Sequence, residues 1–352
     1  MSDRAGRQPD AGQDILLDVR DLETHFISRE GTLRAVDGVS FKVKKGRVLG
    51  IVGESGCGKS VTSQSILRIV PKNGVIAGGS MLLHRDSGDV DLATLDPRGA
   101  EIREIRGKEI AMVFQEPMTS FSPVYSVGNQ IMEVIRLHQK LSKTEAAAEA
   151  VEMLRRVGMP NPETLLNAYP FELSGGMRQR AMIAMALSCR PRLLIADEPT
   201  SALDVTVQAQ ILELLQSLMR ELDMATMLIT HDLGVVAELS HDLLIMYLGK
   251  SVEYGSVRDV FHDPKHPYTV GLLSSIPKLG VSSSGTELTP IQGSVPSLYE
   301  IPPGCPFHPR CPRFMKGICD VGSPPLVEVA PGHEVKCFLY GGAGGAATRS
   351  DA

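Results

Sequence analysis

An octapeptide in the first fifth of the chain is Gly53-Glu54-Ser55-Gly56-Cys57-Gly58-Lys59-Ser60. It fits G-x-x-x-x-G-K-[ST], the phosphate-binding P-loop pattern. An apolar run at 48–52 predicts a buried strand before it, and 61–69 predicts a helix after it, which is the context the motif requires. Backbone N–H groups and the helix N-terminus then face phosphate oxygens. We expect the eight residues and Val61 to bind a nucleoside triphosphate, with Lys59 at the outer phosphates and Ser60 on Mg²⁺.

The composition is that of a globular protein with a large domain and a smaller one. The 352 residues are 43% apolar and 22% charged, with a formal net charge of -5. This charge predicts no cationic face, so nucleic acid is not an expected partner. No apolar run approaches the roughly 18 residues that a membrane span needs. Residues 1–13 are polar and lack a signal-peptide core, so we expect a disordered lead-in and a cytosolic chain with reduced cysteines.

Hydrophobic patterning predicts an α/β fold. Alternation and short apolar runs predict strands at 15–19, 35–43, 48–52, 80–83, 110–114, 192–196, 225–230 and 243–248. Helical spacing predicts helices at 144–157, 173–189, 205–222 and 233–239, with turns or loops at 28–31, 71–79 and 85–88. Strands that alternate with helices indicate a largely parallel sheet with helices on both faces.

Two composition changes divide the chain. The block 124–189 has helical patterns and no strand, which predicts an inserted helical subdomain. Beyond residue 277 the chain is rich in Pro, Gly, Ser and Cys, which predicts a small loop-rich module with little core of its own. The expected organisation is a lead-in at 1–13, a nucleotide-binding domain at 14–276, a Cys-rich module at 277–340 and a flexible tail at 341–352.

A second motif complements the P-loop. The apolar strand at 193–196 ends in two acids, Asp197 and Glu198. Buried acids need a partner, and a Mg²⁺ ion at the P-loop would supply one. We expect Asp197 to hold the metal and Glu198 to orient or deprotonate the attacking water. The alternative is a structural acid pair that caps a turn.

A third stretch, Leu173-Ser174-Gly175-Gly176-Met177, resembles the signature of ATP-binding-cassette ATPases. The resemblance extends from residue 15 to about residue 255 and includes, in order, the P-loop, Gln115 after a strand, the signature, the acid pair, the dimer-contact loop Ser201-Ala202-Leu203-Asp204, and His231. It implies a RecA-like core with an antiparallel β subdomain and an inserted helical subdomain. It also implies hydrolysis of ATP to ADP and phosphate.

The same resemblance implies roles for single residues. Ser174, with the N-terminus of its helix, would bind the γ-phosphate of ATP held by a second subunit. Gln115 would sense Mg²⁺ and the water, and His231 would contact the γ-phosphate. Phe26 would stack on adenine; otherwise it is a core aromatic. Met177 departs from the family's usual Gln, a change we expect to be tolerated.

A closer similarity is to the ATPase subunits of oligopeptide and dipeptide importers. It rests on Phe114-Gln115-Glu116-Pro117-Met118-Thr119-Ser120, Leu173-Ser174-Gly175-Gly176-Met177-Arg178-Gln179-Arg180, His266-Pro267-Tyr268-Thr269 and Pro302-Pro303-Gly304-Cys305-Pro306-Phe307-His308-Pro309-Arg310-Cys311-Pro312. The similarity implies a peripheral motor on the cytoplasmic face of the bacterial inner membrane. Its partners would be two permeases, a solute-binding protein and a second ATPase chain, often a different one. Related importers also move oligosaccharides or nickel chelates.

The motif count predicts how the ATPase works. One P-loop and one signature in a single chain cannot enclose one ATP. Two chains must therefore meet head to tail, with each P-loop facing the partner's signature. ATP would hold them together and hydrolysis would let them separate, which would move the helical subdomain against the permeases.

Four cysteines near the C-terminus, Cys305, Cys311, Cys319 and Cys337, have the spacing C-x5-C-x7-C-x17-C. A [4Fe–4S] cluster tolerates such spacing, whereas zinc prefers short knuckles and disulfides are disfavoured in the cytosol. Zinc and unligated thiols remain alternatives, as does an iron–sulfur redox sensor with a regulatory ATPase. The loop 289–303 is expected to contact the partner ATPase or the edge of ATP, or to be a plain linker.

Overall fold

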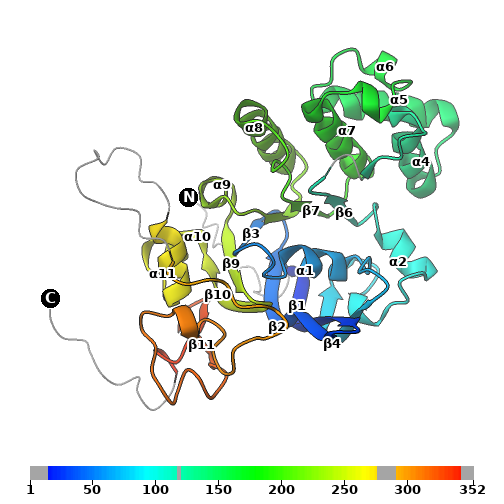
Figure 1. Cartoon of the computed structure of the whole chain (residues 1–352). Helices are drawn as coiled ribbons and strands as arrows, with labels where there is room; N and C mark the ends of the chain where they lie inside the picture. The colour runs from blue at the N-terminus through cyan, green and yellow to red at the C-terminus, as the bar shows by residue number, and fades with distance from the viewer. Residues whose placement is uncertain (1–14, 117–119, 276–290, 342–352) are drawn as a thin grey trace, which may run out of the picture.

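The computed structural model describes residues 15–116, 120–275 and 291–341 (Figure 1). The expected lead-in, nearly all of the expected tail, and residues 117–119 and 276–290 lie outside these ranges. The strands are β1 (Ile15–Ser28), β2 (Gly31–Lys44), β3 (Val48–Val52), β4 (Gly74–Leu83), β5 (Val90–Asp91), β6 (Ile110–Val113), β7 (Leu193–Asp197), β8 (Ala225–Ile229), β9 (Asp242–Tyr247), β10 (Lys250–Ser256), β11 (Leu326–Ala330) and β12 (His333–Lys336).

The helices begin at residues that suit helix starts. Ser142 forms a capping box with Glu145, and Asp204 is the N-cap of its helix, because its carboxylate accepts the N–H groups of Thr206 and Val207. The helices are α1 (Lys59–Ile66), α2 (Ala100–Ile105), α4 (Val127–Gln139), α5 (Lys143–Arg156), α6 (Pro162–Leu165), α7 (Gly175–Leu187), α8 (Val205–Glu221), α9 (Leu233–Leu239), α10 (Val257–His262) and α11 (Pro267–Ser274), with 3₁₀ turns at Leu92–Thr94, Pro170–Glu172 and His308–Arg310.

The larger sheet has the order β11-β12-β10-β9-β3-β8-β7-β6. Strands β6, β7, β8, β3 and β9 are parallel, but β10, β12 and β11 are antiparallel to their neighbours. The sheet is therefore mixed, and the prediction that 243–248 is the last buried strand is wrong. The extra strand β10 follows a tight turn at Leu248 and Gly249, which both have positive φ angles (44° and 77°). Two such residues match the twist of a hairpin.

The smaller sheet is antiparallel in the order β2-β1-β4-β5. The predicted hairpin between β1 and β2 is confirmed, with Ser28 opposite Gly31. The loop predicted at 71–79 is wrong, because β4 begins at Gly74 and pairs with β1 as far as Leu17. Its three glycines hide the alternation of the strand. Gly79 has φ 85°, and a Cβ there would lie 2.4 Å from the Asp21 carbonyl oxygen, so glycine is required at this irregularity in the ladder.

Helices or a second sheet cover each face of the larger sheet. On one face, Ala111, Leu194 and Leu228 pack with residues of α4, α5, α7 and α8. On the other, Ile51 and Met227 pack with α1, α2 and the smaller sheet. Helices α4 to α7 fill the block 124–189, where no strand occurs, as predicted. No helix among the described residues has the combined length and apolarity to cross a membrane.

The C-terminal segment (residues 291–341) lies at the opposite end of the molecule from α4 to α7 (Figure 1). Its strand β12 pairs with β10, so it extends the larger sheet. Phe307, Cys305 and Cys319 are buried in one cluster with Tyr247 of β9 and Tyr268 of α11. The segment therefore shares a hydrophobic core with the rest of the chain.

Candidate functional site

The P-loop connects β3 to α1. Gly58 has φ 102°, and a Cβ there would lie 2.3 Å from the Ala35 carbonyl oxygen, so no other residue fits. The Lys59 ammonium donates to the carbonyl oxygens of Gly53 (2.8 Å) and Glu54 (3.2 Å) and is only 7% exposed. The sequence thus folds this loop around its own lysine, which places a positive charge at the N-terminus of α1.

The end of β7 meets the start of α1. Ser60 Oγ donates to Asp197 Oδ1 at 3.1 Å, and Asp197 is 3% exposed. Burial raises the pKa of this carboxyl, while the hydrogen bond from Ser60 lowers it. A hydroxyl and a buried carboxylate in contact are oxygen ligands of the kind that Mg²⁺ prefers. The donor set fits a magnesium ion bound together with nucleotide phosphates.

Three predicted residues converge one step further along the edge of the sheet. Gln115 Nε2 donates to Glu198 Oε2 at 3.1 Å, and His231 Nδ1 lies 3.6 Å from the same oxygen. The three residues follow β6, β7 and β8, whose carboxyl ends meet at one edge because the strands are parallel. The His231 side chain is 68% exposed, so the group opens to solvent.

A cleft of about 550 Å³ contains most of these residues. Its lining is Phe26, Leu33, Ala35, Ser55, Gly56, Gly58, Lys59, Ser60, Val61, Gln115, Glu198, His231 and Leu298. Phe26 therefore lies at the same cleft as the P-loop, where a purine ring could stack on it. Leu298, in the described part of the loop 289–303, also lines the cleft.

The signature residues 173–177 lie outside this cleft. Ser174 Oγ accepts the Met177 N–H at 3.3 Å and caps α7, while Leu173 is buried. Gly175 and Gly176 face Leu203 and Val207 at the start of α8. None of these residues is among those described as lining the cleft, and neither is any residue of the loop 201–204. One copy of the chain thus holds the two halves of the expected ATP site apart.

The loop 201–204 connects the acid pair to α8. Ser201 Oγ donates to the Glu198 carbonyl oxygen at 3.1 Å. Glu198 itself has φ 47°, and its N–H donates to the Ile229 carbonyl oxygen at 2.8 Å. Ala202 is exposed, and Leu203 packs against the helical core. The loop therefore fixes Glu198 by its backbone.

The four cysteines of the C-terminal segment line one small cavity, here called the four-cysteine cavity. Burial raises the pKa of each of Cys305 and Cys337 to about 11, and it also raises the pKa of Cys311. Thiols held together in this way need a nearby positive charge to ionise. The structure thus brings Cys305, Cys311, Cys319 and Cys337 to one cavity.

Two contacts of Glu54 had no signal in the sequence. Its carboxylate accepts two hydrogen bonds from Arg310, at 2.7 and 3.0 Å, and its N–H donates to Tyr268 Oη at 3.0 Å. Arg310 is separated from Glu54 by 256 positions. Neither Arg310 nor Tyr268 lies near Glu54 in the sequence, so only the fold brings them together.

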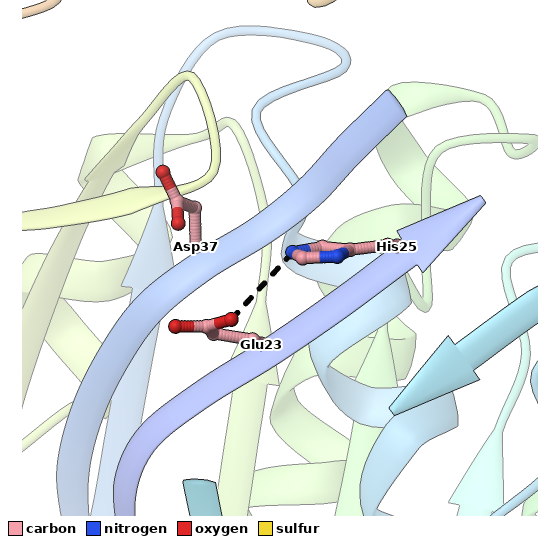
Figure 2. A group of neighbouring side chains, drawn as sticks. All are labelled: Glu23, His25 and Asp37. Atoms are coloured by element: carbon pink, nitrogen blue, oxygen red, sulfur yellow. Dashed lines mark ion pairs between the residues drawn. The ribbon is translucent and has the colours of Figure 1, made fainter. Parts of the chain in front are cut away.

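Figure 2 shows a separate group formed by Glu23 and His25 of β1 and Asp37 of β2. Their ligand atoms lie within 4.8 Å of one another, and His25 Nε2 is 3.8 Å from Glu23 Oε2. Asp37 Oδ2 also accepts from the Lys250 ammonium at 2.7 Å. Because Asp37 already has this ammonium as its partner, we interpret the group as an ion-pair network that joins β1, β2 and β10.

Comparison with known proteins identifies the class. Residues 36–201 match the family model described as "ABC transporter". The dimeric post-hydrolysis structure of the ATP-binding cassette MJ0796, bound to ADP and Pi, is similar with a TM-score of 0.60 at 25% identity, over 69% of this chain and 99% of that one. The cbiO1 structure from Clostridium perfringens, described as part of the cbiONQ complex, gives 0.58 at 27%, over 74% and 96%. The chain belongs to the ABC transporter family, and the predicted cassette fold is confirmed.

Its group within the family follows from the rest of the chain. Residues 252–319 match the model "Oligopeptide/dipeptide transporter, C-terminal region". The probable peptide ABC transporter ATP-binding protein y4tR of Sinorhizobium fredii is 53% identical over 92% of this chain and 95% of its own length. The oligopeptide transport protein OppD of Salmonella typhimurium is 48% identical over 96% and 97%, and the dipeptide transport protein DppD of Bacillus subtilis is 48% identical over 92% and 94%. The chain is an ATP-binding protein of this peptide-transporter group.

Proposed function

We propose that the chain is the ATP-hydrolysing subunit of an importer for dipeptides and oligopeptides. The observation that carries the proposal is the single cleft shared by Phe26, the P-loop, Gln115, Glu198 and His231. The relatives named above are peptide transport proteins, which favours peptides over the oligosaccharides and nickel chelates that we also considered.

The residues of the cleft would each act on a different part of ATP. The adenine would stack on Phe26, and the P-loop N–H groups would hold the phosphates. Lys59 would leave its carbonyl partners to contact the outer phosphates, where its charge stabilises the transferred phosphoryl group. A bound Mg²⁺, held by Ser60, Asp197 and Gln115, would supply charge neutralisation.

The attacking water would be positioned by Glu198, with Gln115 and His231 around it. Glu198 accepts a hydrogen bond from Gln115 and has its backbone fixed by Ile229, so its carboxylate has a defined direction. A positioned carboxylate can orient the water and accept its proton. The exposure of His231 leaves room for the γ-phosphate beside it.

The distance between cleft and signature motivates a head-to-tail pair of ATPase subunits. Ser174 and the residues Leu173, Gly175, Gly176 and Met177 would complete the ATP site of the opposing subunit, with Ser174 and the N-terminus of α7 facing the γ-phosphate. The loop 201–204 would contact that subunit. Closure would move α4 to α7, which would transmit the step to membrane permeases.

The assembly that we propose has two permeases, a second ATPase chain and an external solute-binding protein. The subunit would lie on the cytoplasmic face of the bacterial inner membrane. We also propose that residues 14–276 form the ATPase domain, with its helical subdomain at 124–189, and that residues 277–340 form an adjoining module. The shared core and the pairing of β12 with β10 support a module that folds together with the ATPase domain.

We further propose a [4Fe–4S] cluster in the four-cysteine cavity. Among the described residues, only Glu23, His25 and Asp37 form a group of three or more His, Cys, Asp or Glu side chains whose ligand atoms all lie within 4.8 Å of one another. No three of the four cysteine sulfurs are therefore that close together. Four thiolates on one zinc ion, with Zn–S of about 2.3 Å, would have sulfurs about 3.8 Å apart. Thiolates on different irons of a cluster are farther apart, which fits this cavity better.

The cluster proposal has a direct test. Chain purified without oxygen should be brown and contain iron and acid-labile sulfide in equal amounts. The change Cys311→Ser should remove most of the colour, since it deletes one ligand. Colourless protein with one zinc per chain would contradict the cluster and support the zinc alternative.

The function is tested with the assembled transporter in proteoliposomes. We expect ATP hydrolysis to rise when the solute-binding protein and a labelled peptide are supplied. The peptide should accumulate on the side of the vesicle membrane opposite to the solute-binding protein. A control uses the same vesicles with an oligosaccharide or a nickel chelate. Stimulation by one of these and not by any peptide would contradict the proposed substrate class.

A further inference from the structure

One ion pair joins the C-terminal segment to the P-loop. The two Nη atoms of Arg310 donate to the two carboxylate oxygens of Glu54, at 2.7 and 3.0 Å. The Arg310 side chain is only 5% exposed. Charge-assisted hydrogen bonds in this two-pronged geometry are among the stronger polar contacts in proteins, and little water competes for them here.

The guanidinium of Arg310 is held on its other sides as well. Its Nη1 also donates to Tyr247 Oη at 3.3 Å, and its Nε donates to the Gln292 carbonyl oxygen at 3.1 Å. Its central carbon lies 5.8 Å from the ring centre of Tyr247 and 6.0 Å from that of Phe307. These contacts hold the Arg310 side chain in place independently of Glu54. Arg310 is thus a preformed receptor for the carboxylate.

The carboxylate of Glu54 is electrostatically unfavourable in a loop that binds phosphates. It is the one acid among residues 53–60, and this loop is expected to bind a triphosphate. Its carbonyl oxygen accepts from Lys59 at 3.2 Å, and its N–H donates to Tyr268 Oη. The backbone of Glu54 is therefore fixed beside the lysine, and an unpaired carboxylate there would repel phosphate oxygens at short range.

We propose that Arg310 is a positioning residue for ATP binding: by pairing with Glu54 and neutralising its charge, it keeps the P-loop locally positive. The inference rests on the ATPase function proposed above. It makes the C-terminal segment a working part of the nucleotide site. Cys311, the next residue, lines the four-cysteine cavity, so a change in that cavity has a short covalent route to the P-loop.

The test measures Mg-ATP affinity of the full-length chain by calorimetric titration. Arg310→Gln should bind Mg-ATP about tenfold more weakly than wild type, or about 1.4 kcal/mol. The double variant Arg310→Gln/Glu54→Gln should regain most of that loss, because the repelling charge is gone. Arg310→Lys keeps the charge and should lose less than Arg310→Gln.

The double variant separates this role from a merely structural clamp. Arg310→Gln and the double variant both lack the ion pair. If the pair were only a structural clamp, the two variants would therefore bind Mg-ATP equally weakly, and that result would overturn the proposal. Wild-type affinity in Arg310→Gln, or equal losses in Arg310→Lys and Arg310→Gln, would also overturn it. Lys316→Gln, an exposed charge change in the same segment, is the matched control.

Failure of the two proposals can be told apart. A wild-type chain that binds no Mg-ATP would contradict the proposed function itself. If Arg310→Gln alone does not fold, as judged by its circular dichroism, the double variant and Arg310→Lys still give the comparison. Binding by the double variant that is no tighter than binding by Lys59→Ala, which lacks the P-loop ammonium, then overturns the inference.

Discussion

Replacing Glu198 by Gln removes a base from the cleft with little change of shape. Glu198 Oε2 accepts the hydrogen bond of Gln115 at 3.1 Å and lies 3.6 Å from His231 Nδ1. The Gln amide keeps one oxygen that can accept the Gln115 bond, but it cannot take a proton from water. The positive φ of residue 198 is the same in both proteins, so the loop gains no new strain. The effect should therefore fall on chemistry.

The expected magnitude follows from the role of a general base. Loss of such a group slows catalysis by about 10² to 10⁴, which corresponds to about 2.7 to 5.4 kcal/mol of barrier. Mg-ATP affinity should change little, because the P-loop, Ser60 and Asp197 are untouched. The variant should therefore bind ATP and retain it without turnover.

The assay measures phosphate release by the assembled transporter and Mg-ATP binding by the same preparation. Glu213→Gln is the matched control, since it makes the same chemical change on the exposed face of α8. It should leave turnover at the wild-type level. Turnover in Glu198→Gln within threefold of wild type would refute the role that we give Glu198.

Three further predictions concern stability. Phe307→Ala, at a 1% exposed side chain, should lower the free energy of unfolding by about 3 to 5 kcal/mol in denaturant titrations followed by circular dichroism; a loss below about 1 kcal/mol would show that the C-terminal core is not needed. Tyr268→Phe leaves the Glu54 N–H without its acceptor and should lower the free energy of unfolding by about 1 to 3 kcal/mol in the same assay. An unchanged free energy would contradict this prediction, because it would mean that water replaces the hydroxyl. His241 Nδ1 accepts the Val48 N–H at 3.1 Å, and burial lowers its pKa below the usual 6.5, so the unfolded chain binds more protons and stability should decline as pH falls below 6.5. His241→Asn, which does not titrate, should make the thermal midpoint fall less steeply with acid; equal slopes would contradict this reasoning.

Much of the site could be predicted because its parts are local motifs. The P-loop needs only eight neighbouring residues and the strand and helix that flank them. Gln115, Glu198 and His231 each follow a strand, and parallel strands bring such positions to one edge without further information.

The features that the sequence did not predict depend on contacts between residues far apart in the chain, or on backbone conformations that the residue type does not indicate. Strand β4 starts at Gly74 in a glycine-rich stretch, and its partner β1 decides its conformation. Strand β10 depends on a turn in which Leu248 has a positive φ, which residue type alone does not indicate. The pair of Glu54 and Arg310 spans most of the chain, and a lone Arg between Pro309 and Cys311 gives no hint of its partner.

The central claim is that ATP is enclosed between the cleft of one ATPase subunit and the signature of another. A photo-crosslinking amino acid at position 177 of Glu198→Gln, in the assembled transporter with Mg-ATP trapped, tests it directly. The account predicts crosslinked peptides that carry the P-loop of the opposing ATPase subunit and that vanish without nucleotide. Crosslinks confined to the same subunit while ATP is trapped would contradict it.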